Sequence, residues 1–308
     1  MSVKLLEGKQ VRDQILAELR PRIAALPRPP GLAVVLVGND PASEIYVRNK
    51  VKTCAELGIF SQNLTPPASI TTTELLKLVG ELNERPEIDG ILVQSPLPKH
   101  IDEGRVLEAI SPEKDVDGFH PINAGKLSIN AKGLRPCTPS GVMEMLKRNN
   151  IDVIGKHAVV VGRSDIVGKP MALMLLHANA TVTICHSKTR DLAAMCRQAD
   201  ILVGAIGRPA MLTSEFFKPG AVLIDIGINR LDRREDVARI FRGDAKKLAA
   251  FDAGSRVVVG DFDPLDAVKF GGAFTPVPGG VGLLTIAMLM SNTVTAAEAR
   301  QTGTVPCL

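Results

Sequence analysis

Residues 156–170 read KHAVVVGRSDIVGKP, an apolar run that ends in a turn built from small residues. The apolar part is typical of a buried strand, and Pro170 suits the first turn of a following helix. Gly162, Ser164 and Gly168 form the pattern G-x-S-x-x-x-G, which differs from the usual G-x-G-x-x-G of dinucleotide-binding turns. Small residues still let the backbone approach a pyrophosphate at the helix N-terminus. The alternative is an ordinary turn between a strand and a helix.

The next apolar run indicates which dinucleotide would bind. NAD-binding folds usually place Asp or Glu there, about 20 residues beyond the glycine turn, to hold the ribose 2′-hydroxyl. In this chain the run 181–185 is followed by the polar segment 186–190 (HSKTR), and the first carboxylate is Asp191. Hydroxyls such as that of Ser187, with cations such as Arg163, suit a 2′-phosphate and favour NADP over NAD. The alternative for the cations of the polar segment is a solvated helix start.

Short apolar runs recur along the chain, with helical patterns between most of them. This alternation is typical of parallel strands joined by helices, so we predict an α/β protein with a Rossmann-like unit. Helical patterns cover 8–25, 43–57 and 283–297, with Ser43 as the expected N-cap of the second and Gly58 after its end. The predicted strands are 32–37, 90–94, 158–161, 181–185, 201–205, 221–225 and 257–259.

Two segments rich in Pro and Gly, 132–141 and 275–282, interrupt this rhythm and suggest domain limits. We therefore predict two domains, an N-terminal α/β catalytic domain of residues 1–139 completed by the C-terminal helix within 283–308, and an NADP-binding domain of residues 140–282. The charged stretch between positions 229 and 255 has an amphipathic helical pattern and is expected to be a surface excursion.

Composition limits the classes of function. The 37 basic and 33 acidic residues leave a net charge of +4, and aromatic residues make up 3%, so we expect no nucleic-acid partner. No apolar run is long enough to span a bilayer, and the N-terminus lacks the pattern of a signal peptide. The five cysteines form no C-x-x-C pair, which favours reduced thiols and a cytoplasmic location over disulfides or zinc.

A tyrosine and a lysine four residues apart lie in the second helical pattern. Tyr46 and Lys50 therefore share one helix face. Short-chain dehydrogenases use the same spacing for proton transfer, but there it follows the nucleotide turn, whereas here it precedes that turn by more than a hundred residues. This order argues against that family. The alternative is a core contact by the ring beside a surface charge.

Polar side chains also follow the strand predicted at 90–94. Ligands of open α/β sheets lie beyond the carboxyl ends of strands, which places Gln94 well for binding, although a loop contact is the alternative. Asp115 and Asp117 follow in KDVDG at 114–118. Two carboxylates without further ligands do not make a calcium loop, so we expect no metal, and turn capping is the alternative.

Eight segments combine into a larger pattern. They are PASEIYVRNK (41–50), DGILVQSPLPKHID (89–102), SPEKDVDGFHPINAGKL (111–127), RPCTPSG (135–141), VVVGRSDIVGKP (159–170), TVTICHSKT (181–189), KPGAVLIDIGINR (218–230) and TPVPGGVGLLTIAMLM (275–290). In this order they cover the chain almost end to end. The chain resembles the bifunctional methylenetetrahydrofolate dehydrogenase/methenyltetrahydrofolate cyclohydrolase family.

The resemblance implies an enzyme of one-carbon metabolism. It would oxidise 5,10-methylenetetrahydrofolate with NADP to 5,10-methenyltetrahydrofolate and hydrolyse that product to 10-formyltetrahydrofolate, as a cytoplasmic homodimer. The implied catalytic residues are Lys50, Gln94 and Asp117. The implied folate-binding residues are Tyr46, Lys50, Gln94, Asp117, Pro278 and Gly279. The cofactor-binding residues are expected to be Gly162, Arg163, Ser164, Gly168, His186, Ser187, Ile228 and Thr285.

Three departures from the family pattern are visible. Ser95 stands where the family commonly has Leu, Leu283-Leu284 replaces Pro-Met, and the connection 229–258 is longer and more charged. The first two could alter folate affinity or the fit around the nicotinamide. Two alternatives stay open, a dehydrogenase that has lost its cyclohydrolase and a non-catalytic regulator that binds folate or NADP. Retention of Lys50 and Gln94 argues against the first.

Overall fold

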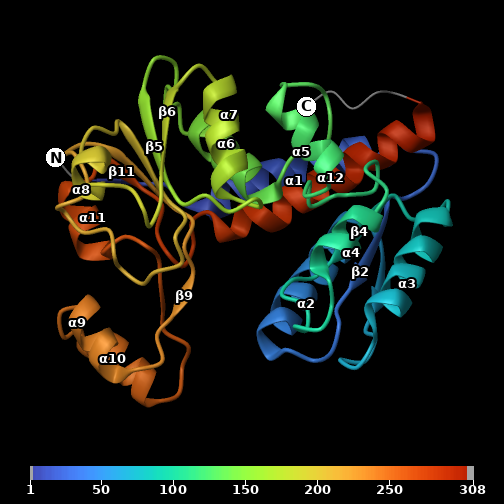
Figure 1. The fold of residues 1–308 in the computed structure, drawn as a ribbon, viewed down its shortest axis with the longest axis horizontal. Coiled ribbons are helices and arrows are strands. Elements are labelled where there is room, and N and C mark those ends of the chain that lie inside the picture. The colour runs from blue at the N-terminus through green and yellow to red at the C-terminus, as the bar shows by residue number, and fades with distance from the viewer. Residues whose placement is uncertain (1–2, 304–308) are drawn as a thin grey trace. The chain divides into compact units, whose positions relative to one another are not determined.

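The structure is a computed structural model, and it describes residues 3–303 of the chain. This part of the chain forms two compact units, each visible in Figure 1. The three-stranded unit contains Asp13–Cys137 and the described residues from Ile286 onward. The six-stranded unit contains Thr138–Thr285 and the described residues up to Arg12.

The three-stranded unit is built on parallel strands in the order β3-β2-β4. The central strand β2 is buried along its whole length, as an unbroken apolar run predicts. Helices α3 and α4 contribute Leu75, Val79 and Val106 to the core that also contains Ala33 and Val35 of β2. The elements are α1 (Gly8–Ala24), β2 (Gly31–Val35), α2 (Pro41–Leu57), β3 (Phe60–Leu64), α3 (Thr72–Glu84), β4 (Gly90–Val93), α4 (Glu103–Ala109), α5 (Pro121–Ser128) and α12 (Gly282–Thr302).

Helix α2 begins two residues before the predicted start. Its N-cap is Asp40, whose Oδ2 accepts a hydrogen bond of 2.8 Å from Ser43 N, so the prediction of Ser43 as N-cap is wrong. The physical reason is Pro41, which lacks an N–H and fits the first helical turn, so the cap falls to the residue before it. Gly58 ends the helix in the left-handed conformation, with φ at 74°, as predicted.

The C-terminal helix α12 extends to Thr302, five residues beyond its predicted end at position 297. The structure also adds strand β3, which the sequence did not predict. Its sequence FSQNL has no apolar run because β3 is an edge strand with every side chain at least partly exposed. No helix within residues 3–303 combines the length and the apolar character needed to cross a membrane.

Lys114 closes the C-terminal end of α3. Its side chain is almost fully buried, and its Nζ donates to the carbonyl oxygens of Leu82, Asn83 and Arg85 at 3.1, 2.7 and 2.8 Å. We expect Lys114→Met to lower the free energy of unfolding by about 2–4 kcal/mol, because these carbonyl oxygens lose their donor. Urea unfolding measures the loss. Lys77→Met, at an exposed position of the same helix, is the control, and equal midpoints for the two variants would contradict this role.

The six-stranded sheet is parallel throughout, in the order β1-β11-β8-β7-β5-β6. The chain order reverses beside β5, which is the doubly wound arrangement that the sequence predicts. Phe262 packs in the core between Phe217 and Phe274, with ring centroids 6.2 and 6.3 Å away. The elements are β1 (Lys4–Leu5), α6 (Cys137–Arg148), β5 (His157–Val161), α7 (Gly168–His177), β6 (Thr181–Cys185), α8 (Leu192–Cys196), β7 (Ile201–Gly204), β8 (Val222–Asp225), β9 (Asn229–Arg230), α9 (Arg234–Ile240), α10 (Ala245–Asp252), β10 (Val258–Val259), α11 (Pro264–Phe270) and β11 (Ala273–Phe274).

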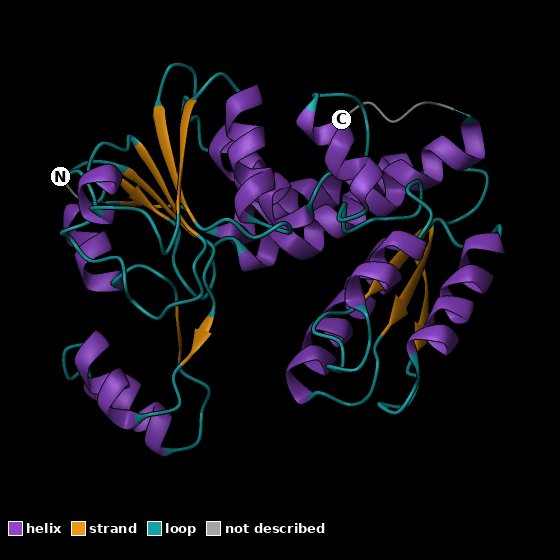
Figure 2. Ribbon diagram, in the orientation of Figure 1, coloured by secondary structure: helices purple, strands orange, loops and turns teal. Residues whose placement is uncertain are grey.

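The charged excursion between β9 and β10 is a small folded body. The strand predicted at 257–259 exists as β10, but it pairs antiparallel with β9 instead of joining the parallel sheet, so that part of the prediction is wrong. Figure 2 shows this short ladder as a stem that leads to α9 and α10. Leu231, Val237 and Ile240 form its apolar core, which explains the amphipathic pattern in a charged stretch.

The division into units differs from the predicted domain limits at the N-terminus. β1 pairs with β11, and the described residues up to Arg12 therefore belong to the six-stranded unit. The chain passes from one unit to the other within α1, at the start of α6 and within α12. The functional limits 1–139 with 283–308 and 140–282 stay a prediction.

Candidate active site

A buried lysine meets the carboxyl end of the three-stranded sheet. Lys50, on α2, is 7% exposed, and its Nζ donates a hydrogen bond of 2.9 Å to Gln94 Oε1. Gln94 follows β4, its backbone N donates to Val35 O at 2.8 Å, and its Nε2 donates to Ser95 O at 2.6 Å. The amide group is therefore fixed with its oxygen toward the lysine. Gln94 thus lies at the strand end that the sequence indicated, and the structure adds its contact with Lys50.

Tyr46 lies one helical turn before Lys50 on α2. Its side chain is 42% exposed, so the ring has a face available to a ligand. The alternative interpretation was a ring in the core and a lysine at the surface. It is wrong, because the ring is partly exposed and the lysine is buried.

The two carboxylates of the segment 114–118 have different surroundings. Asp115 accepts hydrogen bonds from the backbone N of Gly118, Phe119 and His120 at 3.1, 3.2 and 2.8 Å. It is therefore the residue that caps the turn, as the alternative for this segment proposed. Within the described part of the chain, no group of three or more His, Cys, Asp or Glu side chains is arranged to hold a metal ion.

Asp117 has no such set of backbone donors in the described structure. Burial raises its pKa to about 6, while the positive charge of Lys50 opposes the shift and the charge of Asp115 adds to it. The nearby Cys137 thiol also favours the charged form. The charge of Lys50 therefore acts on the carboxyl group of Asp117, and Gln94 is hydrogen-bonded to the same lysine.

Two side chains that the sequence did not single out hold the backbone beside Asp117. Asn292, on α12, donates from Nδ2 to Val116 O and to Arg135 O, each at 2.8 Å, and Cys137 Sγ donates to Val116 O at 3.2 Å. Burial raises the pKa of the Cys137 thiol, and the charge of Asp117 adds to this, so the thiol stays a neutral donor. The signal for Asn292 was an amide within the helical pattern 283–297.

The nucleotide turn of the six-stranded unit has the close contacts that its glycines suggest. Gly162 has φ at 136°, and a Cβ there would lie 2.1 Å from Ala205 O. A Cβ at Gly168 would lie 2.4 Å from Gly162 O. Ser164 Oγ accepts hydrogen bonds of 3.2 Å from the N–H groups of Val167 and Gly168, which closes the turn at the start of α7.

A pocket of about 370 Å³ adjoins this turn, beside β5, where ligands of doubly wound sheets bind. Its lining includes five of the residues expected from the sequence, which are Gly162, Arg163, Ser164, His186 and Ser187. The structure adds Val161, Leu192, Ala205, Ile206, Arg208 and Met211. No sequence motif marks Arg208, a further cation of this lining. Its position just beyond the predicted strand 201–205 was the available signal.

The remaining expected residues also belong to the six-stranded unit, outside the lining of this pocket. Ile228 is 50% exposed just beyond β8. Thr285 Oγ1 lies 3.0 Å from Thr138 Oγ1, so the two hydroxyls share a hydrogen bond. Pro278 and Gly279 are exposed in the segment before α12. Their roles stay predictions.

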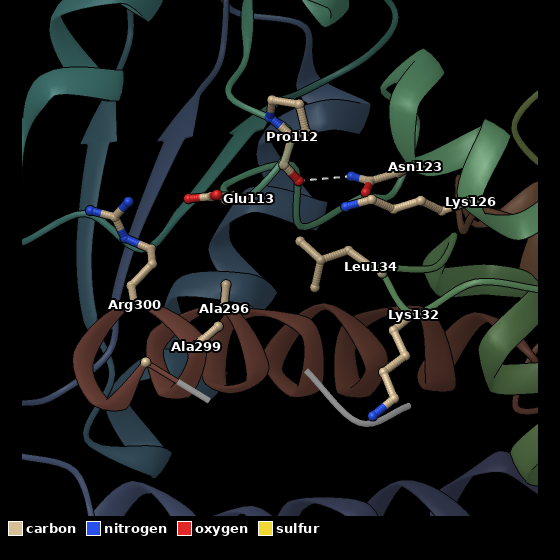
Figure 3. A pocket seen from close by; sticks show the side chains of 11 residues that line it. Pro112, Glu113, Asn123, Lys126, Lys132, Leu134, Ala296, Ala299 and Arg300 are labelled. Atoms are coloured by element: carbon tan, nitrogen blue, oxygen red, sulfur yellow. Dashed lines mark hydrogen bonds between the residues drawn. The ribbon is translucent and has the colours of Figure 1, made fainter. Parts of the chain in front are cut away.

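A second pocket, of about 290 Å³, lies in the three-stranded unit (Figure 3). Leu134, Lys126 and Arg300 line it, and Asn123 Nδ2 donates to Pro112 O at 2.8 Å at its edge. None of the residues expected to bind folate is among its lining residues. It is therefore separate from the group around Lys50.

Each unit carries one part of an oxidoreductase. The six-stranded unit has the sheet order, glycine turn and pocket of a dinucleotide-binding fold. The three-stranded unit has a buried lysine held by a fixed amide near a carboxylate of raised pKa, which are groups suited to proton transfer. The class of protein is therefore a nucleotide-dependent dehydrogenase with acid–base chemistry of its own.

Comparison with known proteins identifies the family within this class. The family model "Tetrahydrofolate dehydrogenase/cyclohydrolase, catalytic domain" matches residues 6–117, and the model of the NAD(P)-binding domain of the same family matches residues 136–301. The chain is 62% identical over 300 residues to the bifunctional protein FolD of Solibacter usitatus (strain Ellin6076), which covers 96% of this chain and 98% of that protein. The chain belongs to the tetrahydrofolate dehydrogenase/cyclohydrolase family.

Solved structures agree with this assignment. The bifunctional FolD enzyme of Campylobacter jejuni has a TM-score of 0.87 and 45% identity, over 97% of this chain and 100% of that one. The Trypanosoma brucei enzyme, complexed with NADP cofactor and an inhibitor, has a TM-score of 0.86 and 36% identity, over 97% and 98% of the two chains. The fold and the family expected from the sequence are thus confirmed.

Proposed function

We propose that this protein oxidises 5,10-methylenetetrahydrofolate with NADP and hydrolyses the resulting 5,10-methenyltetrahydrofolate to 10-formyltetrahydrofolate. The observation that carries the proposal is the hydrogen bond between the buried Lys50 and Gln94, with the charge of Lys50 acting on the carboxyl group of Asp117. Hydride transfer to a nucleotide needs orientation and electrostatics from the protein, whereas ring-opening hydrolysis also needs proton transfer. The lysine therefore serves proton transfer in the hydrolysis, a step that a dehydrogenase alone would not perform.

The three-stranded unit supplies the groups that would bind the folate. The pterin edge offers an exocyclic amine and a ring N–H side by side, and the carboxylate of Asp117 can accept both hydrogen bonds. The exposed ring of Tyr46 can stack on the aminobenzoate ring. The pterin and the reacting carbon would then lie at the carboxyl end of β4, near Lys50.

The two reactions make different demands on Lys50. In the oxidation the methylene carbon loses a hydride to NADP, and the cation left behind is delocalised over two nitrogens. In the hydrolysis, water adds to the methenyl carbon and gives up a proton, one carbon–nitrogen bond breaks, and the released nitrogen takes a proton. Lys50 would move these protons and Gln94 would hold its Nζ in position, and the hydrogen bond between the two supports these roles.

The pocket of the six-stranded unit fits NADP chemically. Gly162 and Gly168 leave room for a pyrophosphate at the start of α7, and Arg163 and Arg208 bring positive charge to the same pocket. Ser187 lies in the lining after β6, where an NAD-binding fold would place a carboxylate. These residues would hold the diphosphate and the 2′-phosphate, and the bound cofactor would supply the hydride acceptor.

Ser187→Asp should reverse the preference for NADP. A carboxylate at this position would repel the 2′-phosphate, so we expect kcat/KM with NADP to fall by about tenfold or more relative to kcat/KM with NAD. Both constants are measured with the native protein and with the variant. Ser255→Asp, an exposed position in the same unit, is the control. Unchanged use of NADP by Ser187→Asp would place the 2′-phosphate elsewhere.

One mixture separates the three candidate functions. The pure protein is given 5,10-methylenetetrahydrofolate and NADP, and nicotinamide reduction and decay of the methenyl chromophore are followed separately. The bifunctional enzyme gives both signals. A dehydrogenase alone reduces NADP while methenyltetrahydrofolate accumulates to the level set by its spontaneous hydrolysis, and a regulator binds both ligands without turnover.

A cytoplasmic homodimer is also part of this proposal. Family resemblance supports the dimer, and sedimentation equilibrium at several protein concentrations tests it. Buried, unbridged thiols support a reducing compartment. They are Cys54, Cys137, Cys185 and Cys196, whereas Cys307 lies outside the described residues.

A further inference from the structure

A fully buried carboxylate lies behind the nucleotide pocket, outside every motif of the sequence analysis. Asp261 follows β10 and has an exposure of 0%. Its Oδ2 accepts hydrogen bonds from Ile206 N at 2.6 Å and Gly207 N at 3.2 Å, and its Oδ1 accepts one from Arg208 N at 2.9 Å. Three successive backbone N–H groups of one loop therefore converge on a single side chain.

The loop that Asp261 holds is a wall of the pocket. Ile206 and Arg208 are lining residues, and so is Ala205 before them. Gly207, between them, has φ at 71°, so the loop turns through the left-handed region. The backbones of Gly162 and Ala205 are so close that a Cβ at Gly162 would lie 2.1 Å from Ala205 O. A small shift of the loop therefore changes the space left for a ligand over the nucleotide turn.

A second buried carboxylate fixes the first. Asp225, the last residue of β8, accepts hydrogen bonds from Asp261 N at 2.8 Å and from Phe262 N at 3.0 Å. It also accepts one from Gly227 N at 3.0 Å, directly before Ile228, which the family resemblance assigns to the cofactor site. One chain of hydrogen bonds thus orders the segments that follow β7 and β8.

Two glycines make this close arrangement possible. A Cβ at Gly227 would lie 2.4 Å from Asp261 Oδ1, and a Cβ at Gly260 would lie 1.8 Å from Asp225 Oδ2. Asn229, in the stem of the charged excursion, donates from Nδ2 to Asp261 Oδ1 at 3.0 Å. The excursion therefore leaves and returns at the point where Asp261 supports the pocket.

We propose that Asp261 is a positioning residue for NADP binding. It acts only through the loop 206–208, which it holds in place as a wall of the pocket. The inference rests on the proposed function for the identity of the ligand and goes beyond it in naming the residue that shapes the site. A carboxylate is required because its two oxygens accept four donors, from the loop and from Asn229. An asparagine of the same size would turn an N–H₂ group toward N–H donors.

The test compares three variants by calorimetric titration with NADP, thermal unfolding and hydrolysis of methenyltetrahydrofolate without NADP. Asp261→Asn should raise the Kd for NADP by about tenfold or more, because a misplaced wall loses contacts along the ligand. Thermal unfolding reports that the protein is folded, and hydrolysis reports that the group around Lys50 in the other unit is intact. Arg163→Ala, which removes a lining cation, should also raise the Kd and so verifies the pocket itself.

The matched control is Asp266→Asn. Asp266 is also a buried carboxylate of the six-stranded unit, and it accepts a hydrogen bond from a backbone N–H, that of Ser214, at 2.8 Å, but it does not line the pocket. It should lower the unfolding temperature and leave the Kd for NADP unchanged. An equal rise in Kd for Asp266→Asn would mean general destabilisation and would overturn the inference.

The outcomes separate this inference from the proposed site. If Arg163→Ala weakens NADP binding and Asp261→Asn does not, the pocket is correct and the role of Asp261 is wrong. If neither variant changes the Kd, the pocket assignment itself fails. Should Asp261→Asn not fold, Gly207→Ala disfavours the loop conformation directly, and its added methyl group meets no atom within 4 Å. Native NADP binding by Gly207→Ala would then overturn the inference.

Discussion

Lys50→Met should hydrolyse methenyltetrahydrofolate at least about a hundredfold more slowly than the native protein, because it keeps the length of the side chain and removes the group that moves protons. Dehydrogenase activity should fall less, since hydride transfer depends mainly on alignment of the folate with the nicotinamide. Methenyltetrahydrofolate should therefore accumulate when the variant receives methylenetetrahydrofolate and NADP. The absorbance of the methenyl chromophore, corrected for spontaneous hydrolysis, measures the effect.

The control for Lys50→Met lies on the same helix. The side chain of Lys52 is 76% exposed and pairs with Glu56 at 3.9 Å, so Lys52→Met should retain both activities. Thermal unfolding establishes that the Lys50 variant is folded. A folded Lys50→Met protein with the native hydrolysis rate would show that the proton passes through another group.

Asp117→Asn should weaken folate binding in both reactions and leave the Kd for NADP nearly unchanged. The neutral amide offers one oxygen where the pterin edge needs acceptors for two N–H groups, which costs about 1–3 kcal/mol and raises the folate KM roughly 5- to 150-fold. Steady-state kinetics of each reaction and titration with NADP measure the two effects. The control is Glu113→Gln, at an exposed neighbouring position. Asp115→Asn would be unsuitable, because Asp115 caps the same turn.

The raised pKa of Asp117 adds a pH dependence whose sign is defined. Its value of about 6 lies above the ordinary 3.8, so the carboxyl group is increasingly protonated as the pH falls through 6. The folate KM of the native protein should then rise by up to about tenfold per pH unit below 6, and that of Asp117→Asn should stay flat. A native KM that is flat between pH 5 and 7 would contradict a role for the ionised carboxylate.

The same shift makes a prediction about stability. Between about pH 3.8 and 6 the folded state holds this proton more tightly than the unfolded state, so the contribution of Asp117 to stability is lost as the pH rises through that window. At pH 7.5 the ionised side chain therefore weakens the fold. Asp117→Asn should unfold at a higher urea concentration than the native protein while binding folate less well. A gain in stability with a loss of function is expected when a functional residue is replaced.

Local patterns predicted most of the fold because the buried parallel strands are continuous apolar runs. Thr181–Cys185 has the bounds that the sequence predicts, and β5 and β8 differ by one residue at the start. The failures have common causes. β3 is an edge strand whose polar side chains carry no apolar signal, and β1 and β11 are two residues long. The pairing of β10 with β9 depends on where the chain returns after an excursion, which no local pattern records.

The site divides in the same way. Tyr46, Lys50 and Gln94 could be selected because each belongs to a helix or strand end with a regular period or a clear boundary. Arg208 and Asn292 could not, since each acts through neighbours that are distant in sequence. The family resemblance implied roles for Tyr46, Lys50 and Gln94, and it implied none for Arg208 and Asn292.

The sequence by itself determined the α/β class and the nucleotide turn at Gly162–Gly168, and its resemblance over eight segments indicated the family. The class and the turn depend on residue types at short spacing, which physical chemistry converts directly into local structure. Only the tertiary structure decided which of Asp115 and Asp117 caps the turn, and that Lys50 is buried against Gln94. The tertiary structure alone also showed that Asp261 holds the loop that lines the nucleotide pocket. Burial and hydrogen-bond partners come from segments far apart in the chain, and a carboxylate becomes a cap, a ligand-binding group or a support only through those partners.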